Sequence, residues 1–470
     1  MMMTLRRIAV VAGAAVLAVA LPRAGDGLLA SAPIGQSQQQ DEVALALRNP
    51  GSHPRVGLPD FLLSGGDATT TAAARTVAEV LWNDLDFERE YYLIPRASAA
   101  NVPVTPVESL PFDRWAELGA DLVLTGTARA SGSNLQIDLR LISVKGDTRG
   151  RQYFGMRYDC GLQTARGPRD CAHQIADDFH KQNRNLDGVA RTKLAFSSDR
   201  DAGRVTGRPS QTAGQGKEIY ISDYDGANQT RFTVNRTINI SPSWSPSGGL
   251  LAYTSYASGF PDIYVANLRE PGRGLGRPAA GSDRVQNQLS AWSPDGSKLA
   301  FMSNRSGNND VWIVNRDGSG LQNLTNNPAN DWAPTWSPDG SKIAFASDRA
   351  GANQLYVINT IGTGLQRLID QKVDRPTWSS LNFIAFTMGS GPGYEIGIYD
   401  FNNPGITVLT SGVGSNESPA VAPNGRHIAF VTTRWGRQQI AVMDRTGQNV
   451  RRITEAGNNT YPNWQPIAGR

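Results

Sequence analysis

The stretch Trp336-Ser-Pro-Asp-Gly-Ser-Lys-Ile-Ala-Phe345 recurs through the C-terminal part of the chain. Related stretches begin at Trp244, Trp292, Trp378 and Val421, and a truncated copy begins at Trp464. Their starts are 42 to 48 residues apart. A repeat of this period, in a chain with 49 glycines and 27 prolines, is typical of the four-stranded blades of a β-propeller.

The number of blades follows from a second marker, an alanine followed by an aromatic residue. It occurs six times, at Phe196, Tyr253, Phe301, Phe345, Phe386 and Phe430. The first pair has no Trp shortly before it, and Trp464 has no such pair after it. Both gaps are filled if the strand near Trp464 pairs with the strand near Phe196, which also leaves no open sheet edge at the join. The sequence therefore predicts six blades, one of them shared between the two ends of the propeller.

Each repeat also contains strand and turn signals. Lys342–Ser347 and Gln354–Asn359 are short apolar runs, and residues 365–368 alternate as a half-buried outer strand does. Pro, Asp and Gly in Ser-Pro-Asp-Gly favour a tight turn. Because the Trp, the Asp and the Asp-Arg pairs (Asp199-Arg200, Asp348-Arg349) recur from blade to blade, we interpret them as packing and turn residues. Asp and Gly are adjacent in the repeat, so it does not match the sialidase Asp-box.

The N-terminus has the pattern of a secretory leader. Arg6 and Arg7 precede an apolar run over residues 8–21, which is short for a membrane span. We expect a signal peptide in residues 1–32 and a mobile segment in 33–50; a retained membrane anchor is the alternative. Ala30-Ser-Ala32 has the form of a cleavage site, but Pro33 after it leaves the site of cleavage open. No later segment is long and apolar enough to span a membrane.

Residues 51–188 have a mixed pattern. Residues 71–85 place apolar side chains at helical spacing, and 169–183 resemble a closing helix. Strand patterns lie at 121–125, 135–141 and 152–156. The sequence therefore predicts a multi-domain chain, with an N-terminal α/β domain (51–188) followed by an all-β propeller over 189–470.

The two cysteines, Cys160 and Cys171, flank a segment that contains Gly and Pro. In an oxidising compartment they are able to close a small loop as a disulfide, although sequence alone does not prove the pairing. Metal binding is the weaker alternative, because only His173 lies nearby and the site would be incomplete.

Several classes of function lack their sequence signals. The net charge of +4 is small and no basic run occurs, so we expect no nucleic-acid partner. The chain has no Gly-x-Ser-x-Gly elbow, no His-Glu-x-x-His helix and no Walker loop. The four histidines (His53, His173, His180, His427) lie on unrelated elements and favour surface or packing roles. We expect no enzyme activity, no cofactor and no metal site, although the sequence does not tell whether a cation occupies the channel.

Two regions together resemble the TolB family, periplasmic propeller proteins of the Tol-Pal system. The likeness is carried by the repeats at Trp292 and Trp336, by residues 219–226, and in the first domain by Trp115-Ala-Glu-Leu-Gly-Ala-Asp-Leu-Val-Leu-Thr-Gly126. The resemblance implies a non-catalytic, monomeric periplasmic adaptor without membrane insertion once the leader is removed. It further implies binding of the lipoprotein Pal at one mouth of the propeller channel. The mature N-terminal segment would bind the inner-membrane protein TolA, supporting outer-membrane integrity and constriction at cell division.

The segment before each blade's Trp leads into the innermost strand and is expected at a channel mouth. In TolB-like proteins these positions contribute to the Pal interface, which here implies Gln286, Gln288, Leu289, Asn330 and Trp332 and, by extension, Asp374, Glu417 and Thr460. Trp332 is either an anchor for the partner or a packing residue against the next blade.

Two other functions remain open at the level of sequence. One is an exported propeller that binds proteins unrelated to the Tol-Pal system, which would not need the N-terminal domain. The other is a propeller hydrolase acting on sugars or peptides, which would need converging acidic residues or a nucleophile facing the channel.

Overall fold

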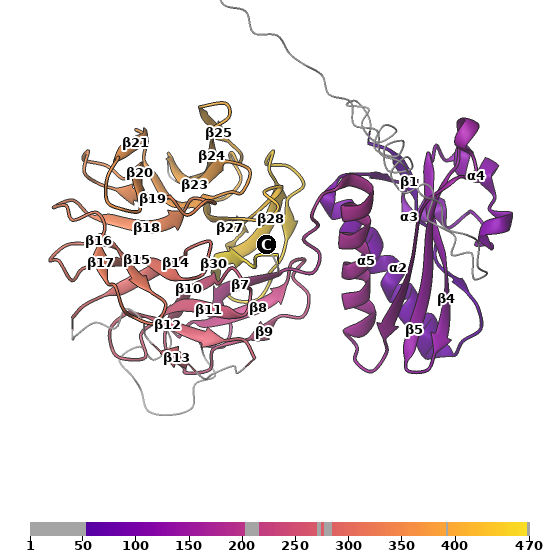
Figure 1. The fold of residues 1–470 in the computed structure, drawn as a ribbon, viewed down its shortest axis with the longest axis horizontal. Coiled ribbons are helices and arrows are strands. Elements are labelled where there is room, and N and C mark those ends of the chain that lie inside the picture. Colours follow the sequence, from indigo (N-terminus) through magenta and orange to yellow (C-terminus); the bar gives the residue numbers. More distant parts are fainter. Residues whose placement is uncertain (1–52, 203–215, 270–273, 277–283, 392, 468–470) are drawn as a thin grey trace, which may run out of the picture.

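The computed structural model describes residues 53–202, 216–269, 274–276, 284–391 and 393–467. The expected signal peptide (1–32) and mobile segment (33–50) therefore lie outside the described residues. The described chain forms an N-terminal α/β unit with a six-bladed propeller beside it (Figure 1). The fold class predicted from the sequence is confirmed.

The N-terminal unit is a sheet covered on one face by two long helices, α2 and α5. The strands follow the order β3-β1-β4-β5-β6, with β2 paired to β4. Their bounds are β1 Arg55–Gly57, β2 Leu62–Leu63, β3 Tyr92–Leu93, β4 Leu122–Ser131, β5 Asn134–Ser143 and β6 Gln152–Gly161. The helices are α2 Ala68–Glu88, α3 Arg96–Ala99, η1 Val107–Ser109, α4 Phe112–Glu117, η2 Gly146–Thr148 and α5 Gly167–Arg184. Helices α2 and α5 lie between the sheet and the propeller (Figure 1).

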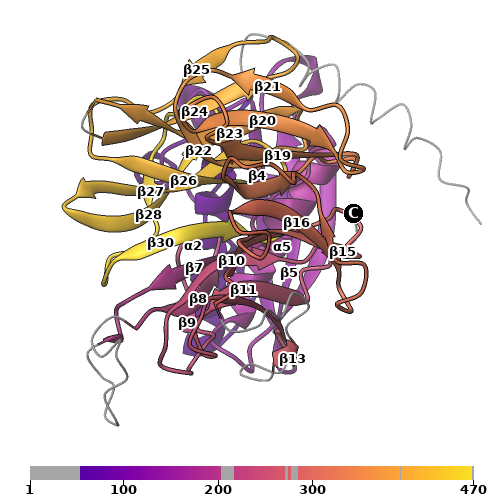
Figure 2. The same cartoon turned by 90° about the vertical axis from the view of Figure 1, so that its left-hand side faces the viewer.

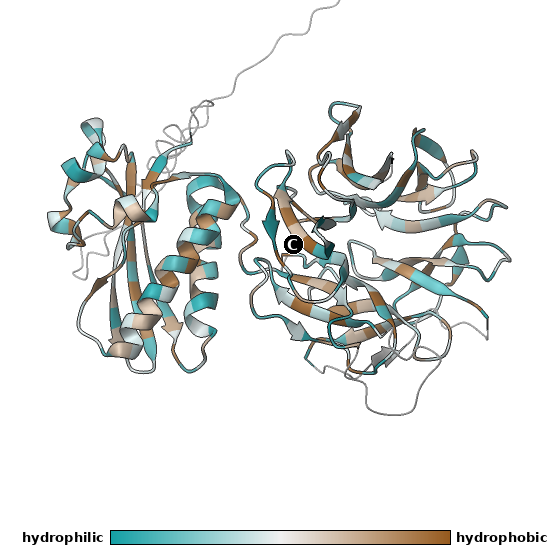
Figure 3. Cartoon of the chain, turned by 180° about the vertical axis from the view of Figure 1, so that it is seen from behind, coloured by the Kyte–Doolittle hydropathy of each residue, from teal (hydrophilic) through white to brown (hydrophobic). Residues whose placement is uncertain are grey.

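The helix expected over residues 71–85 is longer than its apolar pattern. It begins at Ala68 because the Asp67 carboxylate accepts the Thr70 backbone N–H at 2.8 Å and caps the first turn. It ends after Glu88, where Arg89 takes a left-handed conformation with φ of 58°. Hydrophobic and hydrophilic residues alternate along both long helices (Figure 3), as expected for helices with one face on a sheet.

A disulfide joins Cys160, near the end of β6, to Cys171 in the first turns of α5, with the Cα atoms 5.4 Å apart. It ties the start of α5 to the sheet on which the helix packs.

The propeller consists of six four-stranded antiparallel sheets. Blade 1 is β10 Asn239–Trp244, β11 Leu250–Ser255, β12 Asp262–Asn267 and β13 Gly274–Gly276; blade 2 is β14 Asn287–Trp292, β15 Lys298–Ser303, β16 Asp310–Asn315 and β17 Gln322–Asn323; blade 3 is β18 Asp331–Trp336, β19 Lys342–Ser347, β20 Gln354–Asn359 and β21 Gln366–Ile369. Blade 4 is β22 Val373–Trp378, β23 Phe383–Ser390, β24 Gly393–Asp400 and β25 Ile406–Val408; blade 5 is β26 Asn416–Val421, β27 His427–Trp435, β28 Arg437–Asp444 and β29 Arg451–Arg452.

Blade 6 is built from both ends of the propeller sequence. The C-terminal strand β30 (Asn459–Trp464) pairs with β7 (Lys193–Ser198), which is followed by β8 (Glu218–Asp223) and β9 (Thr230–Arg231). Trp464 lies opposite Leu194 in this pairing. The predicted closure of the ring by the last strand is confirmed.

Candidate functional site: the mouth of the propeller channel

The inner strands of the six blades surround a cavity of about 140 Å³ on the propeller axis. Each of β10, β14, β18, β22, β26 and β30 contributes three residues to its lining. The lining includes Arg375 and Tyr461 and is otherwise made of small, apolar, hydroxyl or amide side chains. No carboxylate, histidine or cysteine stands among the described residues that line it.

A β-bulge in every inner strand shapes this lining. The third residue of each strand is left-handed, with φ between 49° and 57° at Ser241, Leu289, Ala333, Arg375, Ser418 and Tyr461. The register with the second strand shifts at the same place in all six blades. A left-handed residue other than glycine costs about 1–2 kcal/mol, so the conformation persists because the neighbouring pairing imposes it.

All six left-handed residues line the cavity, but sequence reasoning named only Leu289 among them. The signal was available. Each of these residues stands three positions before the Trp, or the Val421, that marks its blade, and a proline follows it in five of the six.

The residues expected at the mouth fall on equivalent positions of successive blades. Gln288, Trp332, Asp374, Glu417 and Thr460 are the second residues of β14, β18, β22, β26 and β30. Gln286 and Asn330 immediately precede two of these strands, and Leu289 is a bulge residue. The structure therefore brings these side chains to one level around the axis, where blade 1 presents Ile240, which sequence reasoning did not include.

Polar contacts connect three of the blades across the mouth. The Trp332 indole N–H donates to the Asp374 carboxylate at 2.9 Å, between blades 3 and 4. The adjacent Arg375 places its guanidinium carbon 4.3 Å from the centre of the Tyr461 ring in blade 6 and donates to the Tyr461 hydroxyl at 3.3 Å. Trp332 thus binds the neighbouring blade through its N–H, while its half-buried ring leaves part of its surface open.

The other expected residues differ in how they are held. Glu417 accepts a hydrogen bond from Gln438 at 2.9 Å. Gln288 donates to the Gln286 side-chain oxygen at 3.4 Å, and Gln286 itself is exposed. The hydroxyl of Thr460 is buried and has no hydrogen-bond partner among the described residues.

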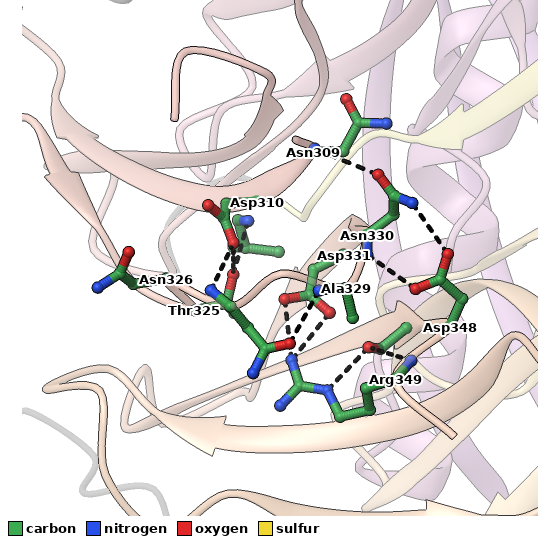
Figure 4. A network of polar contacts seen from close by, with 12 residues as sticks. Asn309, Asp310, Thr325, Asn326, Ala329, Asn330, Asp331, Asp348 and Arg349 are labelled. Atoms are coloured by element: carbon green, nitrogen blue, oxygen red, sulfur yellow. Dashed lines mark hydrogen bonds and ion pairs between the residues drawn. The ribbon is translucent and has the colours of Figure 1, made fainter. Parts of the chain in front are cut away.

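The loop that leads to Asn330 and Trp332 is fixed by a network of polar contacts (Figure 4). At the start of β16, the Asp310 carboxylate accepts from the Thr325 hydroxyl at 3.0 Å and from a loop backbone N–H at 3.2 Å. The backbone and side-chain N–H groups of Asn330 donate to Asp348 at 2.8 and 2.9 Å. The mouth residues of blade 3 therefore stand on a preorganised loop.

The contact between Asp310 and Thr325 has counterparts in three other blades, and we call each such contact a clamp. A residue near the start of the third strand accepts a hydrogen bond from a threonine 15 residues later in Glu218–Thr233, Asp310–Thr325, Glu395–Thr410 and Gln439–Thr454. In three cases the same acceptor also binds the first residue of the next inner strand, at Asn239, Asn416 and Asn459. Sequence reasoning missed this pattern, although its constant spacing is a readable signal.

The arginines of the Asp-Arg pairs do more than form turns, so that interpretation was incomplete. Arg349 stacks its guanidinium 4.9 Å from the Tyr356 ring and donates twice at 2.9 Å to Asp331, at the start of β18. Arg200 reaches Asn459 in the same way at 3.0 Å. Each arginine ties a hairpin to the start of an inner strand.

A second polar cluster lies between the two domains and is centred on Glu88 at the end of α2. Its buried carboxylate accepts from Arg426 at 2.7 Å and from the Val189 backbone N–H at 3.0 Å, and lies 3.1 Å from His427 Nε2. Burial acts to raise the pKa of Glu88, but the hydrogen bond and charge of His427 and the charge of Arg426 hold this pKa well below its usual range. Glu88 therefore remains ionised and links α2 to blade 5.

Three of the four histidines lie at this junction, so the prediction that they lie on unrelated elements was wrong. His173 Nδ1 lies 2.8 Å from the Asp84 carboxylate, His427 contacts Glu88, and His180 is fully buried with its ring 5.6 Å from that of Tyr91. His173 and His180 share helix α5, whereas His427 comes from β27 and reaches the junction through its contact with Glu88 at the end of α2. His53 is exposed.

The described residues contain no group of three or more His, Cys, Asp or Glu side chains placed to hold a metal ion. Within the same part of the chain, none of the helices is long and apolar enough to cross a membrane.

Two family models match the chain. One is described as the TolB beta propeller domain and covers residues 187–468, and the other as the TolB amino-terminal domain and covers residues 52–149. Together they span both structural units.

Among curated relatives, the chain is similar to the Tol-Pal system protein TolB of Desulfosudis oleivorans, with 32% identity over 249 residues, which is 52% of each chain. It is also similar to that of Cereibacter sphaeroides, with 30% identity over 246 residues, or 51% of each. The chain thus spans about half the length of the curated relatives it matches. The crystal structure of TolB from Acinetobacter baumannii superposes with a TM-score of 0.72 at 19% identity, covering 89% of this chain and 98% of that one. At this identity the superposition shows a shared fold.

Proposed function

The chain belongs to the TolB family, and on this premise we propose that it is a non-catalytic periplasmic adaptor of the Tol-Pal system. In this proposal the propeller mouth binds a Pal-type lipoprotein. The N-terminal segment (33–50), released from its leader (1–32), binds a TolA-type inner-membrane protein. The linkage supports outer-membrane integrity and constriction during cell division. The proposal also includes the domain limits, with an α/β domain over residues 51–188 and the propeller over residues 189–470.

The observation that carries the proposal is the arrangement of the mouth. Five side chains of different chemistry, Gln288, Trp332, Asp374, Glu417 and Thr460, occupy one position of five successive inner strands. The surrounding blade positions repeat closely, as the clamps and bulges show. Four of the five side chains are half-buried and Thr460 is buried. Variation at one level of an otherwise regular scaffold, at the mouth of a channel, is expected for a binding surface.

The cavity below the mouth gives no support to the hydrolase alternative. General acid–base catalysis in a channel needs converging carboxylates or a histidine within hydrogen-bond reach of a substrate. The lining residues offer Arg375 and Tyr461 as titratable groups, and these two bind each other. The arrangement favours a surface that binds over one that reacts.

The proposal is tested by calorimetric titration of the purified chain with the soluble domain of a Pal-type lipoprotein from the same organism. We expect one-to-one binding, weakened about 30-fold by Trp332→Ala, since a buried aromatic anchor contributes about 2 kcal/mol or more. Trp82→Ala, at a half-buried tryptophan of α2, is the matched control and leaves the affinity unchanged. A folded wild-type chain that does not bind contradicts the proposal.

The TolA arm has its own test. The same titration with a TolA-type C-terminal domain is expected to give binding to the chain that begins at residue 33 and none to a chain that begins at residue 51. Equal binding by both chains would remove the role proposed for residues 33–50.

A further inference from the structure

Blades 4 and 5 differ from the others in the hairpin between their second and third strands. β23 and β24 have eight residues each, and β27 and β28 have nine and eight. The corresponding strands of blades 1, 2, 3 and 6 have six. The extra residues lengthen the two hairpins on the side where the inner strands begin (Figure 2).

Three exposed apolar side chains lie in or beside these hairpins: two are in the hairpins themselves, and Val413 is in the loop between β25 and β26. Tyr394, Val413 and Trp435 are 41%, 53% and 39% exposed. Ser415 connects them: its hydroxyl accepts the Tyr394 backbone N–H at 3.2 Å, and its backbone pairs with Thr433 in β27. The three side chains therefore belong to one surface formed by neighbouring segments of blades 4 and 5.

Three arginines accompany this apolar surface. The guanidinium carbons of Arg434 and Arg452 lie 5.7 and 5.1 Å from the Trp435 ring centre, and the exposed Arg437 follows in the same turn. Within the described part of the chain, none of the three forms an ion pair with a carboxylate. The patch thus combines aromatic side chains with positive charges that the described chain does not neutralise by direct pairing.

The patch is continuous with the mouth. Gln438, next to Arg437 in β28, donates to Glu417, one of the five mouth residues. A partner seated on the mouth and extending toward blade 5 would therefore meet the arginines without a gap between the two surfaces.

We infer that the hairpin tips of blades 4 and 5, with Arg434, Arg437, Arg452 and Trp435, form a docking patch for a carboxylate-rich surface of the folded protein that seats on the mouth. The inference rests on the proposed function and adds the chemistry of the partner's contacting face. Guanidinium groups bind carboxylates through paired N–H donors, and Trp, Tyr and Arg dominate the binding energy of protein interfaces. Three cations are few for attraction to a lipid surface, which commonly uses four to eight.

The test measures the association rate with the Pal-type domain at about 50 mM and about 500 mM salt. The double variant Arg437→Glu/Arg452→Glu is expected to associate about tenfold more slowly at the lower salt, because charge complementarity acts mainly on the association rate. The difference disappears at the higher salt. Arg316→Glu, at an exposed arginine that follows β16, is the matched control and keeps the wild-type rate. Thermal melts confirm that the variants fold.

The outcomes separate this inference from the function on which it rests. If the wild type binds and the double variant associates equally fast at low salt, the inference of a docking patch is contradicted, whereas the proposed adaptor function is not. If the wild type does not bind, both the docking patch and the proposed adaptor function are contradicted. If the double variant does not fold, the salt dependence of the wild-type rate decides, and a rate that does not change with salt overturns the patch. Binding of anionic vesicles or peptidoglycan fragments that is lost in the variant, with unchanged Pal binding, reassigns the patch to an envelope polymer and overturns the inference.

Discussion

His180 is fully buried beside the domain junction, and neither of its ring nitrogens has a hydrogen-bond partner among the described residues. Burial lowers its pKa from 6.5 to about 4, which outweighs the attraction of Glu88 and Glu90; Arg184 and Arg426 lower it further. The side chain is therefore neutral in the folded protein at neutral pH. The sequence marked it only as a histidine on a helix, because its burial depends on how α5 packs.

This burial predicts a pH dependence of stability. The unfolded chain takes up a proton at position 180 below pH of about 6.5, whereas the folded chain does so only near 4, so stability falls as the pH falls through this range. Between pH 7 and 5 the contribution is about 2 kcal/mol. His180→Phe is expected to flatten the pH dependence of the urea midpoint by this amount, with His53→Phe as the matched control. An unchanged slope would show that His180 is accessible to protons in the folded state.

At the scale of the elements, the sequence predicted the strands better than the polar contacts between them. The Trp and the Ser-Pro-Asp-Gly turn recur at fixed offsets, so the blades, their number and their closure could be read directly. The clamp between Glu395 and Thr410, by contrast, joins β24 to the loop after β25, and its members are chemically ordinary polar residues. The bulge residues were missed for a similar reason, since Ala333, Arg375 and Tyr461 share a backbone conformation and no side-chain chemistry.

The Arg349–Asp331 pair of blade 3 gives a prediction at this scale. Arg349→Ala leaves the fully buried Asp331 without its paired guanidinium, and removing one partner of a buried pair costs about 3–5 kcal/mol. We expect this loss in the free energy of unfolding measured in urea, and a partial recovery when Asp331→Asn is added. Arg114→Ala breaks an exposed pair with Glu117 and serves as the control, with a loss below about 1 kcal/mol. Equal losses in the two variants would show that the buried Arg349–Asp331 pair contributes no more to stability than an exposed pair.

At the scale of the whole molecule, two domains share one apolar core. The cluster that includes Val77 and Phe179 continues to Phe196 and Val442 in the propeller. The Phe87 ring lies 4.2 Å from the His427 ring and 4.8 Å from that of Tyr224. The sequence predicted both domains but not their docking, because contacts such as Phe87–Tyr224 and Phe87–His427 join residues more than 100 positions apart with no repeated spacing.

The ionic part of this docking predicts how the domains respond to its loss. Glu88→Ala leaves Arg426 and His427 facing a buried gap, which is expected to cost about 3–5 kcal/mol and to expose the linker over residues 185–192 to proteases. The control Asp86→Ala removes the partly exposed pair with Arg451 and is expected to cost about 1 kcal/mol or less. Urea unfolding and limited proteolysis measure the two effects. A Glu88→Ala variant as stable and protease-resistant as Asp86→Ala would show that apolar packing alone holds the domains together.

The central claim is that a protein partner seats on the mouth where the inner strands begin. Hydrogen–deuterium exchange of the chain with and without a Pal-type domain tests it most directly. We predict slower exchange in the complex at residues 286–289, 330–333, 373–376 and 432–438, with no change at the Ser-Pro-Asp-Gly turns of 293–296 and 337–340 on the opposite end of the inner strands. Protection confined to those turns, or none in the propeller, would contradict it.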